Sequence, residues 1–126
     1  MKKVIFFVAA TLSFSFAFCQ LKNTKWSGSL KGDNPRGAIL DFGKDTLTVY
    51  SSTGSELIET MTYTTSGQTV TLIKINGQSD CDEATPGTYQ FSIKNDKVVF
   101  KLASDACTDR SSALDATEWT KTKAHS

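Results

Sequence analysis

The sequence has one histidine and three cysteines in 126 residues, and this scarcity excludes several kinds of catalytic site. His125 is the next-to-last residue, in a Lys-Thr-Lys-Ala-His-Ser tail. A serine or cysteine nucleophile needs an adjacent base, which is most often histidine, and zinc sites need several histidine or cysteine ligands. We therefore expect no hydrolytic triad, no metal centre and no cofactor.

The sequence also lacks an excess of positive or negative charge. Lys and Arg total 14 and Asp and Glu total 13, which gives a formal net charge of +1. Nucleic-acid-binding domains usually carry a basic stripe, often beside exposed aromatic side chains, and the sequence shows neither pattern. The glycines form no phosphate-binding loop, since Gly28, Gly32 and Gly37 do not fit the spacing of one. We therefore expect no nucleic-acid partner.

The chain also lacks an apolar run long enough to cross a membrane as a helix, which takes about twenty residues. Its longest run covers residues 4–18, follows a short basic region and is broken by hydroxyl residues. The small side chains of Ala17 and Cys19 suit signal-peptidase cleavage before Gln20. We predict that residues 1–19 are a secretory signal peptide, that the mature chain has no membrane span, and that it is periplasmic or extracellular.

Cys19 has an alternative interpretation, as the lipid-carrying cysteine of a bacterial lipoprotein. Such sites resemble Leu-(Ala/Ser)-(Gly/Ala)-Cys, whereas the bulky Phe18 precedes Cys19 here. We favour cleavage without lipidation, and the lipoprotein remains the alternative. In both cases Cys19 is not available for pairing within the folded domain.

Cys81 and Cys107 form an even pair in the expected mature chain. Exported compartments are oxidising, so we predict a disulfide between them. Chain-entropy arithmetic for a loop of this length gives a stabilisation of about 3–4 kcal/mol. Acidic residues near the pair offer oxygen ligands for Ca²⁺, but their spacing matches no calcium loop, and we expect a solvated polar loop instead. These residues are Asp80, Asp82, Glu83, Asp105 and Asp109.

Short segments of alternating apolar and polar residues recur along the chain, separated by turn-forming residues. The predicted strands cover residues 25–30, 37–43, 46–51, 56–64, 69–75, 87–93, 97–103 and 116–121, and residues 105–114 are the one helical candidate. Eight antiparallel strands in hairpin order close most simply into an up-and-down barrel, because closure removes the exposed edges. We predict this all-β barrel, with an open two-sheet β-sandwich as the alternative.

Alternation also predicts which side chains face the interior. Glu59 shares a strand face with Leu57, Met61 and Tyr63, where a carboxylate is costly unless it is paired or hydrogen-bonded. In the alternative, Ile58 marks the inner face or Glu59 lies in water at the open mouth. The other residues predicted to face inward are Leu40, Phe42, Leu47, Val49, Leu72, Phe91, Val98, Phe100, Leu102 and Trp119. So many bulky groups favour a nearly filled interior.

Two motifs give the chain a family resemblance. Trp26-Ser27-Gly28 opens the first predicted strand, and Cys107-x-x-Arg110 lies just before the last. The remaining shared positions are Cys81, Pro86-Gly87-Thr88-Tyr89 and Trp119. On these residues the chain resembles small exported bacterial lipocalin-like (calycin-type) domains, whose function is undefined.

The resemblance implies one barrel domain over residues 20–126. It also implies that Trp26 and Arg110 pack together and close one end of the barrel. Thr24 stands where lipocalins usually have a glycine, and the chain is short for a ligand carrier. Both departures argue against a large pocket.

These observations leave three hypotheses for function. The first is an exported, non-enzymatic domain that binds a small apolar or amphipathic ligand in the barrel. The second is a barrel filled by its own side chains that acts as a structural module or contacts an unidentified protein. The third, which we favour least, is an enzyme with acid–base chemistry from Glu59 and a tyrosine. The candidate ligand-binding residues are Glu59, Met61, Tyr63, Tyr89 and Phe91, and Arg110 is expected to be structural.

Overall fold

Eight β-strands and one short helix lie within residues 20–122, the part of the chain that this computed structural model describes. They are β1 (Thr24–Leu30), β2 (Arg36–Phe42), β3 (Thr46–Ser51), β4 (Leu57–Ser66), β5 (Thr69–Gly77), β6 (Pro86–Lys94), β7 (Lys97–Asp105), α1 (Thr108–Leu114) and β8 (Thr117–Lys121). All predicted strands are confirmed with small shifts of their ends, and the helical candidate begins later than expected. The predicted signal peptide, Cys19 and His125 lie outside the described residues.

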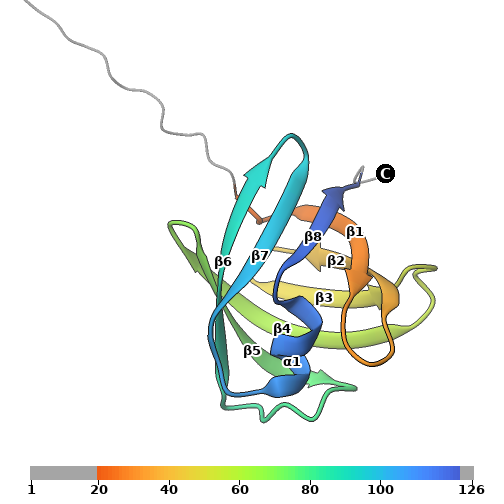
Figure 1. The fold of residues 1–126 in the computed structure, drawn as a ribbon, viewed down its shortest axis with the longest axis vertical. Helices are drawn as coiled ribbons and strands as arrows, with labels where there is room; N and C mark the ends of the chain where they lie inside the picture. Colours follow the sequence, from red (N-terminus) through yellow and green to blue (C-terminus); the bar gives the residue numbers. More distant parts are fainter. Residues whose placement is uncertain (1–19, 123–126) are drawn as a thin grey trace, which may run out of the picture.

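The strands form one closed sheet. Each strand pairs antiparallel with the next along the chain, and β8 pairs back onto β1 (Figure 1). The predicted up-and-down barrel is therefore confirmed, and the open sandwich is wrong. The β8–β1 junction brings Gly28 against Trp119, where a Cβ on residue 28 would lie 2.7 Å from the indole. A glycine at this position lets the two strands approach.

The two ends of the barrel differ. At one end, which we call the helix end, α1 and the connection between β5 and β6 lie across the barrel (Figure 1). The Lys31 N–H, just after β1, donates to the Ala113 carbonyl of α1 at 3.0 Å. At the opposite end the Thr122 N–H donates to the Lys25 carbonyl at 2.8 Å, and Leu21 is fully buried. The chain therefore enters and leaves the barrel at the end far from α1.

The interior follows the predicted alternation. The predicted inward residues are buried, with Leu57 and Leu102 as the exceptions. Phe42 lies at the centre of an aromatic group, edge-on to Tyr63 at 5.0 Å and stacked with Phe100 at 6.4 Å between ring centroids. Such contacts add to the stabilisation from apolar burial alone. Much of the barrel is thus filled by its own side chains.

Leu57 and Leu102 depart from the prediction because the pairing of their strands is irregular. The β3–β4 register shifts between Val49 and Tyr50, which pair with Glu59 and Leu57, so that Ile58 is an extra residue in β4. As a result Ile58 and Glu59 are both buried, while Leu57 is 46% exposed. An extra residue of this kind reverses the faces of the side chains beyond it. Leu102 is 37% exposed and lies beyond the last β7–β8 pair, where its N–H donates to an Asp115 carboxylate oxygen instead.

Candidate functional site

A cavity of about 230 Å³ lies at the helix end, between α1 and the barrel wall. Most of its lining is aliphatic and comes from β1, β2, β3, β4 and α1. The apolar lining residues are Leu30, Leu40, Leu47, Val49, Ile58, Met61, Ala113 and Leu114. The polar lining residues are Glu59, Gln78, Ser79, Asp109 and Arg110. The arrangement suits an apolar molecule with a polar end.

Glu59 is the buried carboxylate of this cavity and is 6% exposed. Its two oxygens accept hydrogen bonds from Ser79, one from the backbone N–H at 3.1 Å and one from the hydroxyl at 2.5 Å. Gly77 makes this possible, since its φ of +143° and the Glu59 backbone leave no room for a Cβ. The chain can then turn directly over β4 and present Ser79 to the carboxylate. These hydrogen bonds offset the cost of burying the charge.

Arg110, from the first turns of α1, is the cation of the cavity. Its Nε and Nη2 donate to the two carboxylate oxygens of Asp105 at 2.6 and 2.8 Å, and Nη2 also donates to the Thr85 carbonyl at 2.9 Å. The side chains of Arg110 and Asp105 are 3% and 0% exposed. Nη1 of Arg110 is buried and has no hydrogen-bond partner among the described residues. Asp105 accepts further hydrogen bonds from the Tyr89 hydroxyl and the Cys107 N–H.

The electrostatics of this cluster keep the ion pair charged. Burial raises the pKa of the Asp105 carboxyl, but the hydrogen bonds from Arg110, Tyr89 and the Cys107 N–H outweigh burial and hold the pKa below its ordinary value. Burial lowers the pKa of the Arg110 guanidinium, but the hydrogen bonds to Asp105 and the charge of Asp105 outweigh burial and raise this pKa above its ordinary value. Burial, followed by the hydrogen bond to Asp105, raises the pKa of the Tyr89 phenol, which therefore stays protonated.

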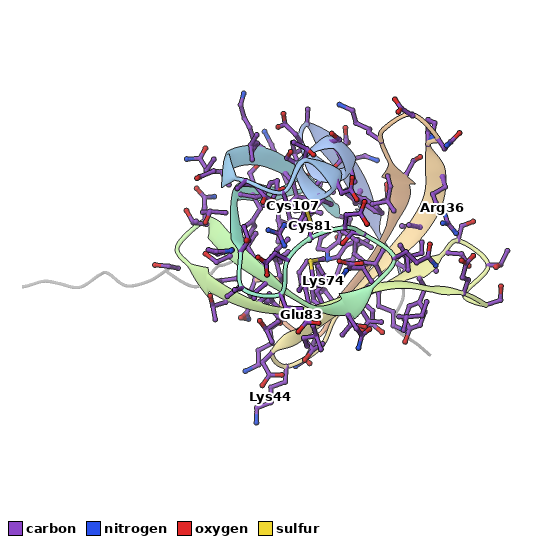
Figure 2. The ribbon with its side chains drawn as sticks, turned by 90° about the horizontal axis from the view of Figure 1, so that it is seen from below. Arg36, Lys44, Lys74, Cys81, Glu83 and Cys107 are labelled. Atoms are coloured by element: carbon purple, nitrogen blue, oxygen red, sulfur yellow. A yellow bond between two sulfur atoms is a disulfide. The ribbon has the colours of Figure 1, made fainter. Side chains whose placement is uncertain are left out.

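The predicted disulfide is confirmed and lies beside this cluster. Cys81 and Cys107 are joined with an S–S distance of 2.03 Å. The bond links the β5–β6 connection to the residue before α1, and the end-on view of Figure 2 shows it near the middle of the helix end. A second link is the Asp109 carboxylate, which accepts the Asp80 N–H at 2.8 Å. Together they hold the connection and the helix over the cavity.

The five candidate ligand-binding residues separate in the structure. Glu59 and Met61 line the cavity. The Tyr63 hydroxyl donates to the Gly43 carbonyl at 2.5 Å, toward the other end of the barrel, and Tyr89 donates to Asp105. Phe91 is buried in the core. Neither tyrosine hydroxyl donates to Glu59.

Trp26 and Arg110, which the resemblance expects to pack together, have other partners in the structure. The Trp26 indole N–H donates to the Thr24 hydroxyl at 2.8 Å, and the ring is buried in the core. Arg110 binds Asp105 and Thr85 and lines the cavity. The ion-pair partner of Arg110 is therefore a carboxylate five positions earlier in the sequence.

Sequence reasoning missed Gln78, Ser79, Ala113 and Leu114, and it named Arg110 and Asp109 without placing them at a ligand cavity. A serine in a polar connection carries no local sign that it will meet a carboxylate 20 positions away. The α1 residues belong to a seven-residue helix whose position over the barrel depends on contacts remote in the sequence. The pair Cys81 and Cys107 was the one sequence feature that pointed to this site. A disulfide between them predicts that the β5–β6 connection lies beside the segment that precedes α1.

The described residues hold no cluster of three or more His, Cys, Asp or Glu side chains suited to a metal ion. Within residues 20–122, no helix combines the length and apolar character needed to span a membrane.

Comparisons with known proteins found no match to this chain among protein-family models, curated proteins or solved structures. The eight-stranded closed barrel is compatible with a lipocalin-like fold.

Proposed function

We propose that this chain is an exported, non-enzymatic binding domain that holds a small apolar or amphipathic molecule in the cavity beneath α1. The observation that carries the proposal is an aliphatic cavity of about 230 Å³ with two carboxylates, Glu59 and Asp109, and one guanidinium, Arg110, in its wall. Pockets for drug-sized ligands usually measure about 300–1,000 Å³, so the ligand is smaller than these. The resemblance to lipocalin-like domains supports the same class of function.

Export is the second part of the proposal. It is supported by the signal-peptide pattern of residues 1–19 and by the disulfide, since disulfides persist in oxidising compartments. In this proposal the mature domain begins at Gln20, and the lipoprotein remains the alternative.

The runner-up is a filled barrel that acts through its surface. It is favoured by the packing of the barrel away from α1, where Trp26, Phe42 and Trp119 are buried with almost no exposed surface. The proposed test therefore has to separate a filled cavity from an empty one.

The test is native mass spectrometry of the protein purified from the periplasm or medium of its own host, with two variants. Ala113→Phe places a ring in the cavity wall, and Ser112→Phe, on the exposed face of the same helix, is the matched control. We expect a co-purifying small molecule on the parent and on Ser112→Phe, and none on Ala113→Phe. Thermal melts establish that each variant is folded.

A clean apo mass for the parent, together with no binding of small apolar probes by calorimetry, would overturn the proposal and favour the filled barrel. Equal retention of the molecule by both folded variants would place the ligand outside the cavity and would also count against it.

A further inference from the structure

Glu59 is a buried carboxylate without a counter-ion. It is 6% exposed, and it accepts hydrogen bonds from the N–H and the hydroxyl of Ser79, both of which are neutral groups. Lys74 reaches the same turn, but its ammonium donates to the Ser79 carbonyl, and no ion pair among the described residues includes Glu59. Neutral hydrogen bonds offset part of the cost of burying a charge, and a cation would offset more of it.

The carboxylate of Glu59 lies at the wall of the cavity beneath α1. Glu59 and Ser79 both line the cavity, and they meet at the two carboxylate oxygens. A carboxylate has about four acceptor sites, of which Ser79 uses two. Most of the remaining lining is aliphatic, so the carboxylate borders a space where water screens its charge poorly. A ligand that enters this space can donate to Glu59.

The other charges of the lining do not compensate Glu59. Among the described lining residues Arg110 is the one cation, and Asp105 already neutralises it through two hydrogen bonds. Asp109 is a second carboxylate of the lining and is exposed. The lining therefore carries excess negative charge, which disfavours an anionic ligand and favours a cationic one.

The same charge extends over the helix end as a whole. The four connections at this end, residues 31–35, 52–56, 78–85 and 106–116, carry seven carboxylates and two cationic side chains. The carboxylates are those of Asp33, Glu56, Asp80, Asp82, Glu83, Asp109 and Asp115, and the cations are Lys31 and Arg110. Arg36, at the start of β2, pairs with Glu56 and leaves the other carboxylates in excess. A surface of one sign attracts ligands of the opposite sign and speeds their association.

We propose that the cavity binds a small primary amine with an apolar body, whose ammonium donates to Glu59 while the body packs against the aliphatic wall. An ammonium has three donors and no acceptor, which fits a carboxylate with unused acceptor sites. The size of the ligand follows from the volume, since a cavity of about 150 Å³ binds benzene and 230 Å³ therefore suits on the order of nine non-hydrogen atoms. This inference rests on the proposed binding function, and it adds the chemical class of the ligand.

The test compares three compact probes on the domain from residue 20 onward, by isothermal titration calorimetry at pH 7 and physiological ionic strength. Cyclohexylmethylamine, cyclohexylmethanol and cyclohexanecarboxylate share the same ring and carry a positive, a neutral and a negative head group. We expect the amine to bind at least about tenfold more tightly than the alcohol, because folding has already dehydrated Glu59 and only the ammonium loses water on binding. The carboxylate should bind most weakly of the three.

Glu59→Gln tests the origin of this preference, because glutamine keeps the shape of the side chain and removes its charge. We expect the ratio of amine to alcohol affinity to fall at least about fivefold in this variant. Glu83→Gln is the matched control, since it removes the same charge from an exposed residue of the helix end that is not part of the cavity lining. Its ratio should stay within about twofold of the parent's, because salt screens an exposed charge. If Glu59→Gln does not fold, the ranking of the three probes on the parent remains the test.

The outcomes separate the two proposals. Binding of none of the probes, with no co-purifying molecule, would overturn the binding function itself. Binding of the alcohol or the carboxylate as tightly as the amine, or an equal fall of the ratio in both variants, would leave a binding domain and overturn the assignment of Glu59 as its ammonium site. If none of the probes binds but a molecule co-purifies, an ammonium group in that molecule supports the proposal and its absence overturns it.

Discussion

Asp105 and Arg110 form an ion pair with two hydrogen bonds at the junction of β7 and α1, and neither side chain is more than 3% exposed. The pair joins the end of the barrel wall to the helix over the cavity. Because removal of either partner leaves a buried charge, the pair has stronger consequences for stability than an exposed one.

Arg110→Ala should destabilise the protein by about 3–5 kcal/mol, since the Asp105 carboxylate is then buried without its counter-ion. Thermal or urea unfolding measures the change. Arg36→Ala is the control, because Arg36 binds Glu56 at 2.9 Å in a pair exposed to solvent, and it should melt close to the parent. Equal melting temperatures for the Arg110 and Arg36 variants would contradict the buried pair.

Acid should weaken the contribution of Asp105. The folded-state pKa of this carboxyl lies below its ordinary value of 3.8, so its stabilisation is present above that value and is lost as the pH falls toward the folded-state pKa. We expect the difference in unfolding free energy between the parent and Asp105→Asn to be constant near neutral pH and to shrink below about pH 4. A difference that persists unchanged at pH 2 would show that the charge of Asp105 is not its source.

Tyr89 should resist ionisation in alkali. Burial, and then the hydrogen bond to Asp105, raise the pKa of its phenol. The protonated Tyr89 phenol therefore stabilises the folded state below its ordinary pKa of 10.0, and this stabilisation is lost as the pH rises above that value. In an ultraviolet titration, Tyr89 should ionise only when the protein unfolds, and Tyr89→Phe should reduce the amplitude of the late step, to which Tyr63 also contributes because burial raises the pKa of its phenol. An unchanged titration curve in the variant would disprove the assignment.

Loss of the disulfide should destabilise the domain substantially. Cys81 and Cys107 are 26 positions apart, for which chain-entropy arithmetic gives about 3.5 kcal/mol. The double variant Cys81→Ser/Cys107→Ser should show this loss in urea unfolding. Thiol labelling of the denatured, unreduced domain from residue 20 onward should find no free cysteine, and labelled thiols would rule the bridge out.

Gly87→Ala should disturb the Asp105–Arg110 ion pair, because a Cβ on residue 87 would collide with both side chains. A Cβ on residue 87 would lie 2.6 Å from Arg110 Nε and from Asp105 Cγ, which is closer than real contacts. Overpacking of this kind costs about 1–3 kcal/mol. Gly43→Ala is the control, because the nearest atom to its Cβ would be the Thr46 carbonyl oxygen at 3.5 Å. We expect unfolding experiments to show a large loss for the first variant and little change for the second.

The barrel could be predicted from the sequence because its strands follow a strict two-residue period. Leu40, Phe42, Leu47 and Val49 alternate with polar residues, and this pattern alone determines which face is buried. The period fails where pairing shifts, and Leu57 is exposed for that reason. No local feature of the sequence marks such a shift, because it depends on the partner strand.

The candidate site was less predictable, because most of it depends on contacts between distant segments. Alternation led to Glu59 and Met61. The Asp105–Arg110 pair has no helical spacing to reveal it, since Asp105 ends β7 and Arg110 lies in α1. Ser79 meets Glu59 only because Gly77 allows the chain to turn over β4.

The hydrogen bond from the Thr122 N–H to the Lys25 carbonyl holds the last described residue beside the start of β1. This position decides where a second protein or a surface can be joined to the domain. Both ends of the described chain leave the barrel on the side opposite α1 (Figure 1). A fusion partner, an affinity tag or a surface anchor joined through either end would therefore leave the cavity facing outward. Immobilised protein should bind its ligand as the free domain does, and a linker between the two ends would give a circular permutant with an unobstructed cavity.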